Sequence, residues 1–190
     1  YLATGAARVI LGEVNSGNPT YLNGPTEVAG QRAEVIIANP SGIRINGGAF
    51  LNASGVTLTT GKPVFNAGNL EAFRVTQGTV AVAGLGLDTS TADYSRILAR
   101  AIEVNAGVWA KHLTVIAGAN EVSALASGTA AIATPISGSG AAPNFMLDVA
   151  AIGGMYAGHI YLVGTEAGLG VNNNGSLVAQ QSDLVLTANG

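Results

Sequence analysis

The sequence has 190 residues, enough for one sizeable core in a single domain. Hydrophobic residues make up 48% of the chain and charged residues only 10%, and the 27 glycines require frequent chain reversals. The net charge is −3 and all eight basic residues lie between Arg8 and Lys111, so there is no basic stripe of the kind that binds nucleic acid.

The chain contains no cysteine, which excludes disulfides and metal sites made of thiolates. Its most apolar segment, residues 145–164, is interrupted by Asp148, by paired glycines and by His159, so it is not suited to span a bilayer. The chain starts at Tyr1 without the basic segment of a signal peptide. We expect a soluble chain without membrane insertion, which is either a fragment or has lost its signal peptide.

Residues 39–42, Asn-Pro-Ser-Gly, form the first clear predicted turn. Pro40 fixes φ at the second turn position, Asn39 offers a side-chain acceptor to the turn backbone, and Gly42 suits the fourth position. Proline also removes a donor from a strand ladder, so this segment belongs at a corner between strands. Ile43 then begins the next strand.

Short strands with alternating apolar and polar residues dominate the rest of the chain. In chain order the pattern occurs in residues 55–60, 112–118, 145–150, 159–164 and 183–190. Helical periodicity is limited to residues 94–101, which could equally form a loop leading into a strand. Since alternate side chains of a strand share one face, we expect these residues to face the core: Val56, Leu58, Leu113, Val115, Leu147, Ile160 and Leu162.

The strand centres near Ile36, Thr57, Ala81 and Glu103 follow one another at about 20 to 24 residues, a spacing typical of a solenoid. Glycine and asparagine at the corners and small aliphatic residues on the strands favour stacked coils. Sandwiches and barrels also show short strands at even spacing. Residues 124–144 are a low-complexity insertion on the surface, for which a flexible loop and a hairpin remain alternative interpretations.

Candidate catalytic and metal-ligating residues are few. His112 and His159 are isolated on strands, where a structural or solvent-facing role is usual. Asp88 and Asp93 flank a loop and are a poor carboxylate pair for hydrolysis, because a loop fixes no geometry between them. The chain has no Gly-x-Ser-x-Gly nucleophile, no His pair with metal-ligand spacing and no glycine-rich loop opening a helix. We predict that it is not an enzyme and holds no cofactor and no metal.

The segment "GQRAEVIIANPSGIRINGGAFLNASGVTLTTG" resembles the secretion domain of two-partner secretion exoproteins, the haemagglutinin/haemolysin-type family of filamentous haemagglutinin and the contact-dependent inhibition proteins. The family carries an Asn-Pro-Asn-Gly-Ile motif, which Asn39, Pro40, Gly42 and Ile43 match and from which Ser41 departs by a small polar residue. The resemblance continues through most of the chain, so residues 1–190 are interpreted as a single β-helix secretion domain.

In the family an earlier Asn-Pro-x-Leu motif precedes a segment similar to "TGAARVIL". Tyr1 and Leu2 would be its last two residues, so we expect that the chain lacks the first strands of the domain and ends within a repeat at Gly190. Haemolysin members often carry a cysteine pair where this chain has residues 46–49, Asn-Gly-Gly-Ala. The resemblance therefore favours the adhesin and contact-inhibition branch.

The resemblance implies a right-handed parallel β-helix with extra-helical hairpins or loops, acting as a monomer. It also implies recognition in the periplasm by the soluble domains of a dedicated outer-membrane transporter, with Asn39, Pro40, Ser41, Gly42 and Ile43 as the recognition or structural motif. The domain would guide a large adhesin or contact-inhibition toxin to the surface of a Gram-negative bacterium or into the extracellular space.

Two other functions use the same architecture. A polysaccharide-cleaving β-helix enzyme needs clustered Asp, Arg or Lys on one face, and this chain has few of them. A carbohydrate-binding adhesin passenger would bind glycans without a transporter. The fold alone does not separate these alternatives from a secretion domain.

Overall fold

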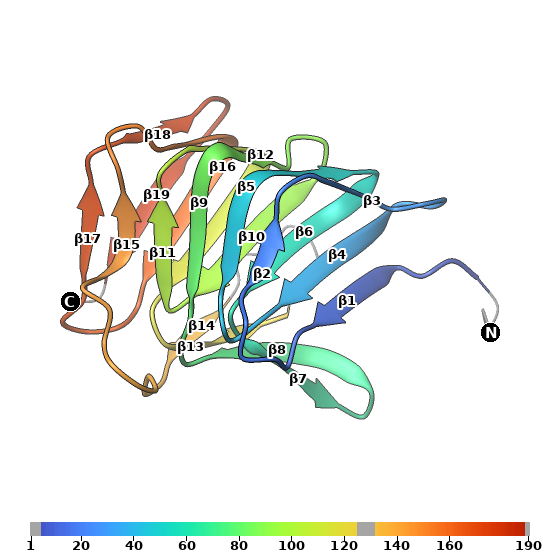
Figure 1. Cartoon of the computed structure of the whole chain (residues 1–190), viewed down its shortest axis with the longest axis horizontal. Helices are drawn as coiled ribbons and strands as arrows, with labels where there is room; N and C mark the ends of the chain where they lie inside the picture. Colours follow the sequence, from blue (N-terminus) through green and yellow to red (C-terminus); the bar gives the residue numbers. More distant parts are fainter. Residues whose placement is uncertain (1–4, 125–131, 189–190) are drawn as a thin grey trace.

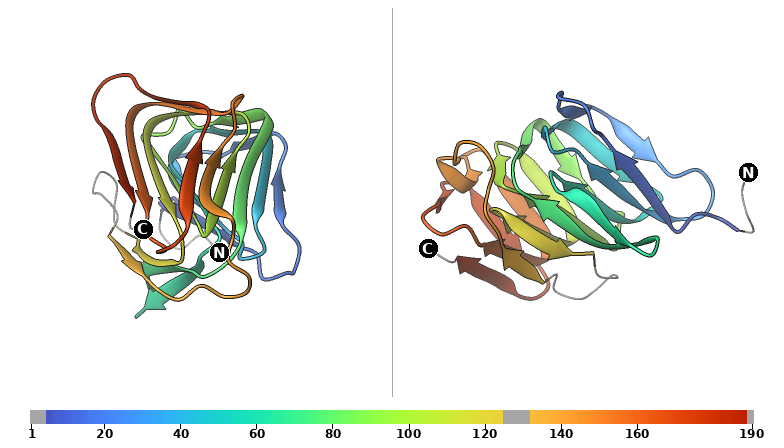
Figure 2. Two further views of the ribbon diagram at one scale, coloured as in Figure 1. Left: turned by 90° about the vertical axis from the view of Figure 1, so that its left-hand side faces the viewer. Right: turned by 90° about the horizontal axis from the view of Figure 1, so that it is seen from below.

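The computed structural model describes residues 5–124 and 132–188, and this part of the chain contains strands, turns and irregular connections but no helix. Successive coils of the chain lie side by side along one axis, and each coil runs along three faces (Figures 1 and 2). Most strands pair in parallel with the strands of the preceding and following coils. The predicted all-β fold, a parallel β-helix, is confirmed. Among the described residues, no helix is long and apolar enough to cross a membrane.

Face 1 is the most extensive of the three faces. It comprises β1 (Val9–Glu13), β4 (Ala33–Ala38), β6 (Ala53–Thr59), β10 (Tyr94–Ala99), the second halves of β12 (Gly107–Ala117) and β16 (Gly154–Gly164), and β19 (Leu184–Ala188).

Faces 2 and 3 share two long strands that bend from one face to the other. Face 2 comprises β2 (Thr20–Leu22), the first halves of β5 (Ile43–Leu51) and β9 (Thr79–Asp88), β11 (Ala101–Val104), β15 (Phe145–Val149) and β17 (Gly170–Asn173). Face 3 comprises β3 (Pro25–Glu27), the second halves of β5 and β9, the first halves of β12 and β16, and β18 (Ser176–Ala179). In β5 the bend lies at Gly47, whose φ of 80° disfavours residues with a side chain.

The core consists of the side chains that point inward from all three faces. All seven residues predicted from alternation to face inward are buried in it: Val56, Leu58, Leu113, Val115, Leu147, Ile160 and Leu162. The parallel register places similar aliphatic residues above one another, as in the pairing of Leu113 with Ile160 and of Val115 with Leu162. This stacking lets mostly small and medium aliphatic side chains fill the interior, together with the ring of Phe50.

A second, antiparallel sheet lies outside the β-helix. It contains β7 (Lys62–Asn66), β8 (Asn69–Val75), β13 (Asn120–Ser123) and β14 (Ala133–Pro135), in the order β14-β13-β8-β7. Its inner side chains, among them Phe73 and Val122, pack on apolar side chains that point outward from face 1, such as Leu98 and Ile116. Of the low-complexity segment 124–144, residues 125–131 lie outside the described residues, and β14 belongs to the rest.

The predicted repeat is right in two of its three steps. Ile36 pairs with Thr57 on face 1, and Ala81 pairs with Glu103 on face 2. The step from Thr57 to Ala81 is wrong as a coil repeat, because the hairpin β7–β8 lies between them and the two residues are on different faces. Residues 94–101, the only segment with helical periodicity, span β10 and the first residue of β11.

Candidate functional site

The Asn39–Gly42 turn forms the corner between β4 on face 1 and β5 on face 2. The Gly42 amide donates to the Asn39 carbonyl at 3.0 Å, which closes the turn, and the Ser41 amide donates to Asn39 Oδ1 at 2.9 Å. The predicted turn and the acceptor role of the Asn39 side chain are therefore confirmed. Ile43, the first residue of β5, is fully buried in the core.

The side chain of Asn39 joins this corner to the preceding coil. Its Nδ2 donates to the Asn18 carbonyl at 3.0 Å and to Thr20 Oγ1 at 2.9 Å. Asn39 is 0% exposed, so within the folded domain its side chain cannot touch a partner. Any effect of Asn39 on recognition must act through the shape of the corner.

The following coil packs closely on the other side of the same corner. Gln77 Nε2 donates to the Pro40 carbonyl at 3.3 Å, and a Cβ added to Gly78 would lie 2.6 Å from that carbonyl oxygen. A Cβ on Gly42 would lie 2.9 Å from the Thr79 carbonyl oxygen, and the φ of Gly42 is 108°. Glycine is thus required at both positions by the close approach of two backbones.

One side of the motif borders a hollow on face 2. Ser41, whose Oγ donates to the Ser16 carbonyl at 2.9 Å, and Gly42 form part of its wall. The hollow has a volume of roughly 200 Å³. Its lining residues are Pro19, Ser41, Gly42, Arg44, Gly78, Thr79, Ala81 and Glu103. Sequence reasoning missed the hollow, because it depends on the register of strands that are far apart in the chain.

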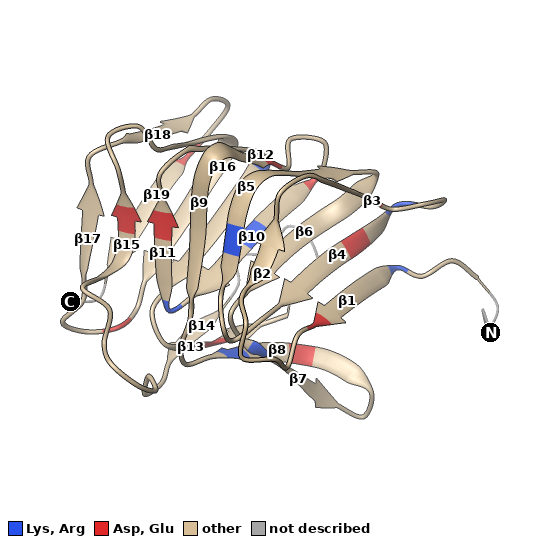
Figure 3. Ribbon diagram, viewed as in Figure 1, with Lys and Arg blue, Asp and Glu red and all other residues tan. Residues whose placement is uncertain are grey.

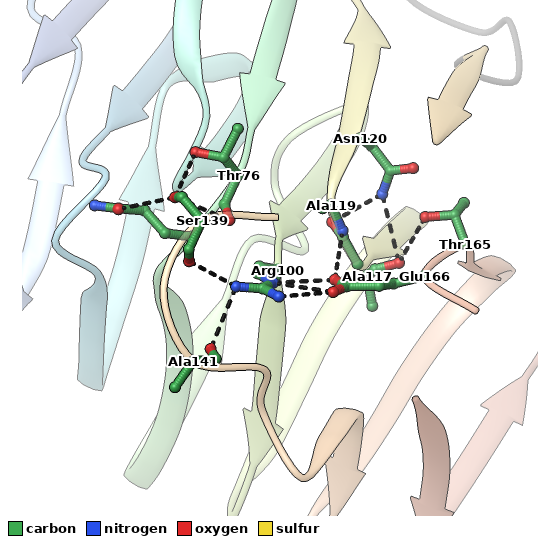
Figure 4. A network of polar contacts seen from close by, with 11 residues as sticks. Thr76, Arg100, Ala117, Ala119, Asn120, Ser139, Ala141, Thr165 and Glu166 are labelled. Carbon is green, nitrogen blue, oxygen red and sulfur yellow. Dashed lines mark hydrogen bonds and ion pairs between the residues drawn. The ribbon is translucent and has the colours of Figure 1, made fainter. Parts of the chain in front are cut away.

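An ion pair stabilises a later corner between the same two faces (Figure 4). Arg100 Nη2 and Nε donate to the two carboxylate oxygens of Glu166 at 2.7 and 3.0 Å, and the Ala119 amide also donates to Glu166. Arg100 Nη1 donates to the carbonyls of Ser139 and Ala141. The hydrogen bonds from Arg100 hold the pKa of the Glu166 carboxyl below its usual value, and the bond to Glu166 raises the pKa of Arg100.

The two histidines lie far from the corner motif in the fold. The His112 and His159 rings stack on neighbouring coils with centroids 4.5 Å apart, on the outer side of face 1. Their outward position agrees with the structural or solvent-facing role expected for each.

The two aspartates considered as a carboxylate pair have separate local roles. Asp88 Oδ1 accepts from the Ser90 amide at 2.9 Å, whereas Asp93 forms an ion pair with Arg32 at 3.2 Å and lies 3.6 Å from Lys111. Asp88 therefore stabilises its own loop, and Asp93 takes part in a surface ion pair. Tyr1 and Leu2, interpreted as the remnant of an upstream motif, lie outside the described residues.

Comparisons with known proteins agree on one relationship. The family described as the TPS secretion domain matches residues 1–190. The "tRNA nuclease CdiA-2" of Burkholderia pseudomallei is 46% identical over 191 residues, which cover 100% of this chain. The "16S rRNA endonuclease CdiA" of Enterobacter cloacae is 48% identical over 185 residues, which cover 97% of this chain. The chain spans only 6% and 5% of the lengths of these curated relatives.

A solved structure, the crystal structure of the filamentous hemagglutinin secretion domain, superimposes on this fold with a TM-score of 0.79 and 39% sequence identity. The match covers 90% of this chain and 59% of the other. The fold therefore defines a β-helical secretion domain. The chain belongs to the TPS secretion domain family. The predicted resemblance is confirmed, and the CdiA relatives fit the predicted contact-inhibition branch.

Exoproteins with such a domain are exported by Gram-negative bacteria to the cell surface or beyond, with the help of an outer-membrane transporter that recognises the domain. The comparisons give this chain no support as a polysaccharide-cleaving enzyme or as a glycan-binding passenger.

Proposed function

We propose that residues 1–190 act as one monomeric domain that is recognised in the periplasm by the soluble domains of the outer-membrane transporter. The domain then guides a contact-inhibition toxin or adhesin through the outer membrane. The observation that carries this proposal is the family match over the whole chain, together with the intact Asn39–Ile43 corner. Segment 124–144 would act as a surface insertion.

The direct test is secretion of the full-length exoprotein in cells with and without the transporter. We expect the exoprotein to reach the cell surface or the medium only when the transporter is present, and only when residues 1–190 are intact. Equal amounts outside the cell without the transporter, or after deletion of these residues, would contradict the proposal.

The role of the corner in recognition is tested by Asn39→Ala. The variant loses an acceptor for the Ser41 amide and two donated bonds, so we expect a loss of about 2 to 3 kcal/mol in the free energy of unfolding. The many stacked coils should keep the domain folded. We expect the amount of exoprotein outside the cell to fall much more than the loss of stability explains.

Asn52→Ala is the matched control. Asn52 Nδ2 likewise donates two hydrogen bonds, here to the carbonyls of Val28 and Gly30, but Asn52 follows β5 at the corner between faces 3 and 1. Its φ of 56° adds backbone strain to the loss of these bonds when alanine replaces it. We expect a comparable fall in Tm with near-normal secretion. If both variants lose secretion in proportion to stability, the Asn39 corner is only structural. Pro40→Ala and Ser41→Asn complete the series; Ser41→Asn restores the family residue and should secrete normally.

A further inference from the structure

Two opposite charges flank the hollow beside the corner motif. Arg44 on β5 and Glu103 on β11 both pair with Ala81 on β9, one from each side, so a single small side chain separates them. Neighbouring strands are about 4.8 Å apart, which puts the two charged residues roughly 10 Å apart at the backbone. Figure 3 shows the basic band on β5 and the acidic band on β11, with β9 between them.

Both charges lack a partner within the described residues. The side chains of Arg44 and Glu103 are exposed and make no hydrogen bond or ion pair there, whereas Arg32, Arg74 and Arg100 are each paired with an acid. Glu103 also stands directly beside Asp148 in the parallel register. Like charges at paired positions destabilise a sheet, and neither Glu103 nor Asp148 forms an ion pair within the described residues.

The hollow suits a protein side chain better than a free ligand. Its volume, roughly 200 Å³, is below the range of about 300 to 1,000 Å³ usual for small-molecule pockets. Next to it, Tyr21 pairs with Arg44 and is 62% exposed, and exposed tyrosines are favoured at protein interfaces. Tyr21, Arg44, Ala81 and Glu103 thus form a continuous strip across four coils of face 2.

We propose that this strip, with the hollow at its centre, is the docking surface for the transporter. The transporter segment would place a carboxylate against Arg44 and a basic side chain against Glu103, with a small side chain in the hollow over Ala81. This inference rests on the proposed function, since it names the surface through which the transporter reads the domain. Ser41 and Gly42 form one wall of the hollow, so the corner motif shapes the surface without Asn39 being exposed.

The first experiment reverses each charge in the full-length exoprotein. Arg44→Glu and Glu103→Lys should each reduce secretion through the transporter about tenfold, because like charges then meet across the interface. Neither side chain bonds to the described fold, so Tm should not fall; in Glu103→Lys it should rise slightly, because the repulsion from Asp148 is removed. Lys62→Glu on β7 and Glu27→Lys on β3 are controls, since both residues are exposed and neither side chain makes a hydrogen bond or ion pair within the described residues. They should secrete normally.

The second experiment fills the hollow and maps contact directly. Ala81→Leu should reduce secretion to a similar extent, whereas Ala83→Leu, on the same strand outside the hollow, should not. A photoreactive phenylalanine analogue at Tyr21 should crosslink the transporter, and the same analogue at Trp109, which is 42% exposed on face 3, should not.

Normal secretion of the Arg44, Glu103 and Ala81 variants would overturn the docking surface. In that case, if export still required the transporter and residues 1–190, the proposed function would stand. Crosslinking at Trp109 but not at Tyr21 would place the transporter on face 3 and also overturn the inference. Export without the transporter would instead contradict the proposed function itself.

Discussion

Replacing Glu166 by glutamine is expected to lower the free energy of unfolding by about 3 kcal/mol. The side chain of Arg100 is 7% exposed, and Glu166 accepts from it through both carboxylate oxygens. Glutamine keeps the volume of the side chain but removes the charge, so a buried guanidinium would lose its counter-ion. Urea unfolding of the wild type and the variant at pH 7 measures the difference.

The same contact predicts how stability depends on pH. Because Arg100 holds the pKa of Glu166 below its usual value in the folded state, the carboxyl binds a proton more readily when the chain is unfolded. The stabilisation from this group is present above the unfolded pKa and is lost as the pH falls through the folded pKa. The stabilities of wild type and Glu166→Gln should therefore converge in acid.

The control for this prediction is Glu121→Gln. Glu121 forms an ion pair with Arg74 at 3.2 Å, but the two side chains are 44% and 56% exposed. An exposed pair of this kind contributes at most about 1 kcal/mol, so we expect little change. If both substitutions lowered the free energy of unfolding equally, the burial of Arg100 would not explain the stabilisation by its ion pair.

Alternation predicted the inward side chains well, because the period of two is a property of the strand itself and needs no knowledge of its neighbours. Val56 and Leu58 face the core for this reason. The long-range features had no such local signal. Arg100 and Glu166 are separated by 66 residues, and the hollow requires β5, β9 and β11 to lie in a particular register.

The second sheet does leave a signal in the sequence, separate from the alternation. Residues 35–38, 97–99, 115–117 and 162–163 are continuous apolar runs, and the last two interrupt the alternation of segments 112–118 and 159–164. A continuous run is typical of a strand covered on both faces. In the structure Leu98 and Ile116 point outward from face 1 under the antiparallel sheet, which explains the runs. These runs predict that something covers face 1, but not that the hairpin β7–β8 does so.

Replacing Phe73 by alanine is expected to cost about 4 kcal/mol and to loosen the antiparallel sheet from face 1. Phe73 is 0% exposed on β8, the strand between β7 and β13, and it belongs to the apolar layer that holds this sheet on the β-helix. Its removal leaves a cavity in that layer, while the inner core of the β-helix keeps all of its side chains. Urea unfolding gives the cost, and hydrogen exchange of the backbone amides locates it.

Phe65→Ala is the control, because Phe65 is 52% exposed on the neighbouring strand β7. A surface change of this kind should alter stability by about 0.5 kcal/mol or less. In Phe73→Ala, exchange should accelerate in β7, β8 and β13 more than in β6, β10 and β12, because local opening requires only that the outer layer separates. Equal acceleration in both groups of strands would mean that the two sheets unfold as one cooperative unit, and that the outer sheet is part of what holds the coils together.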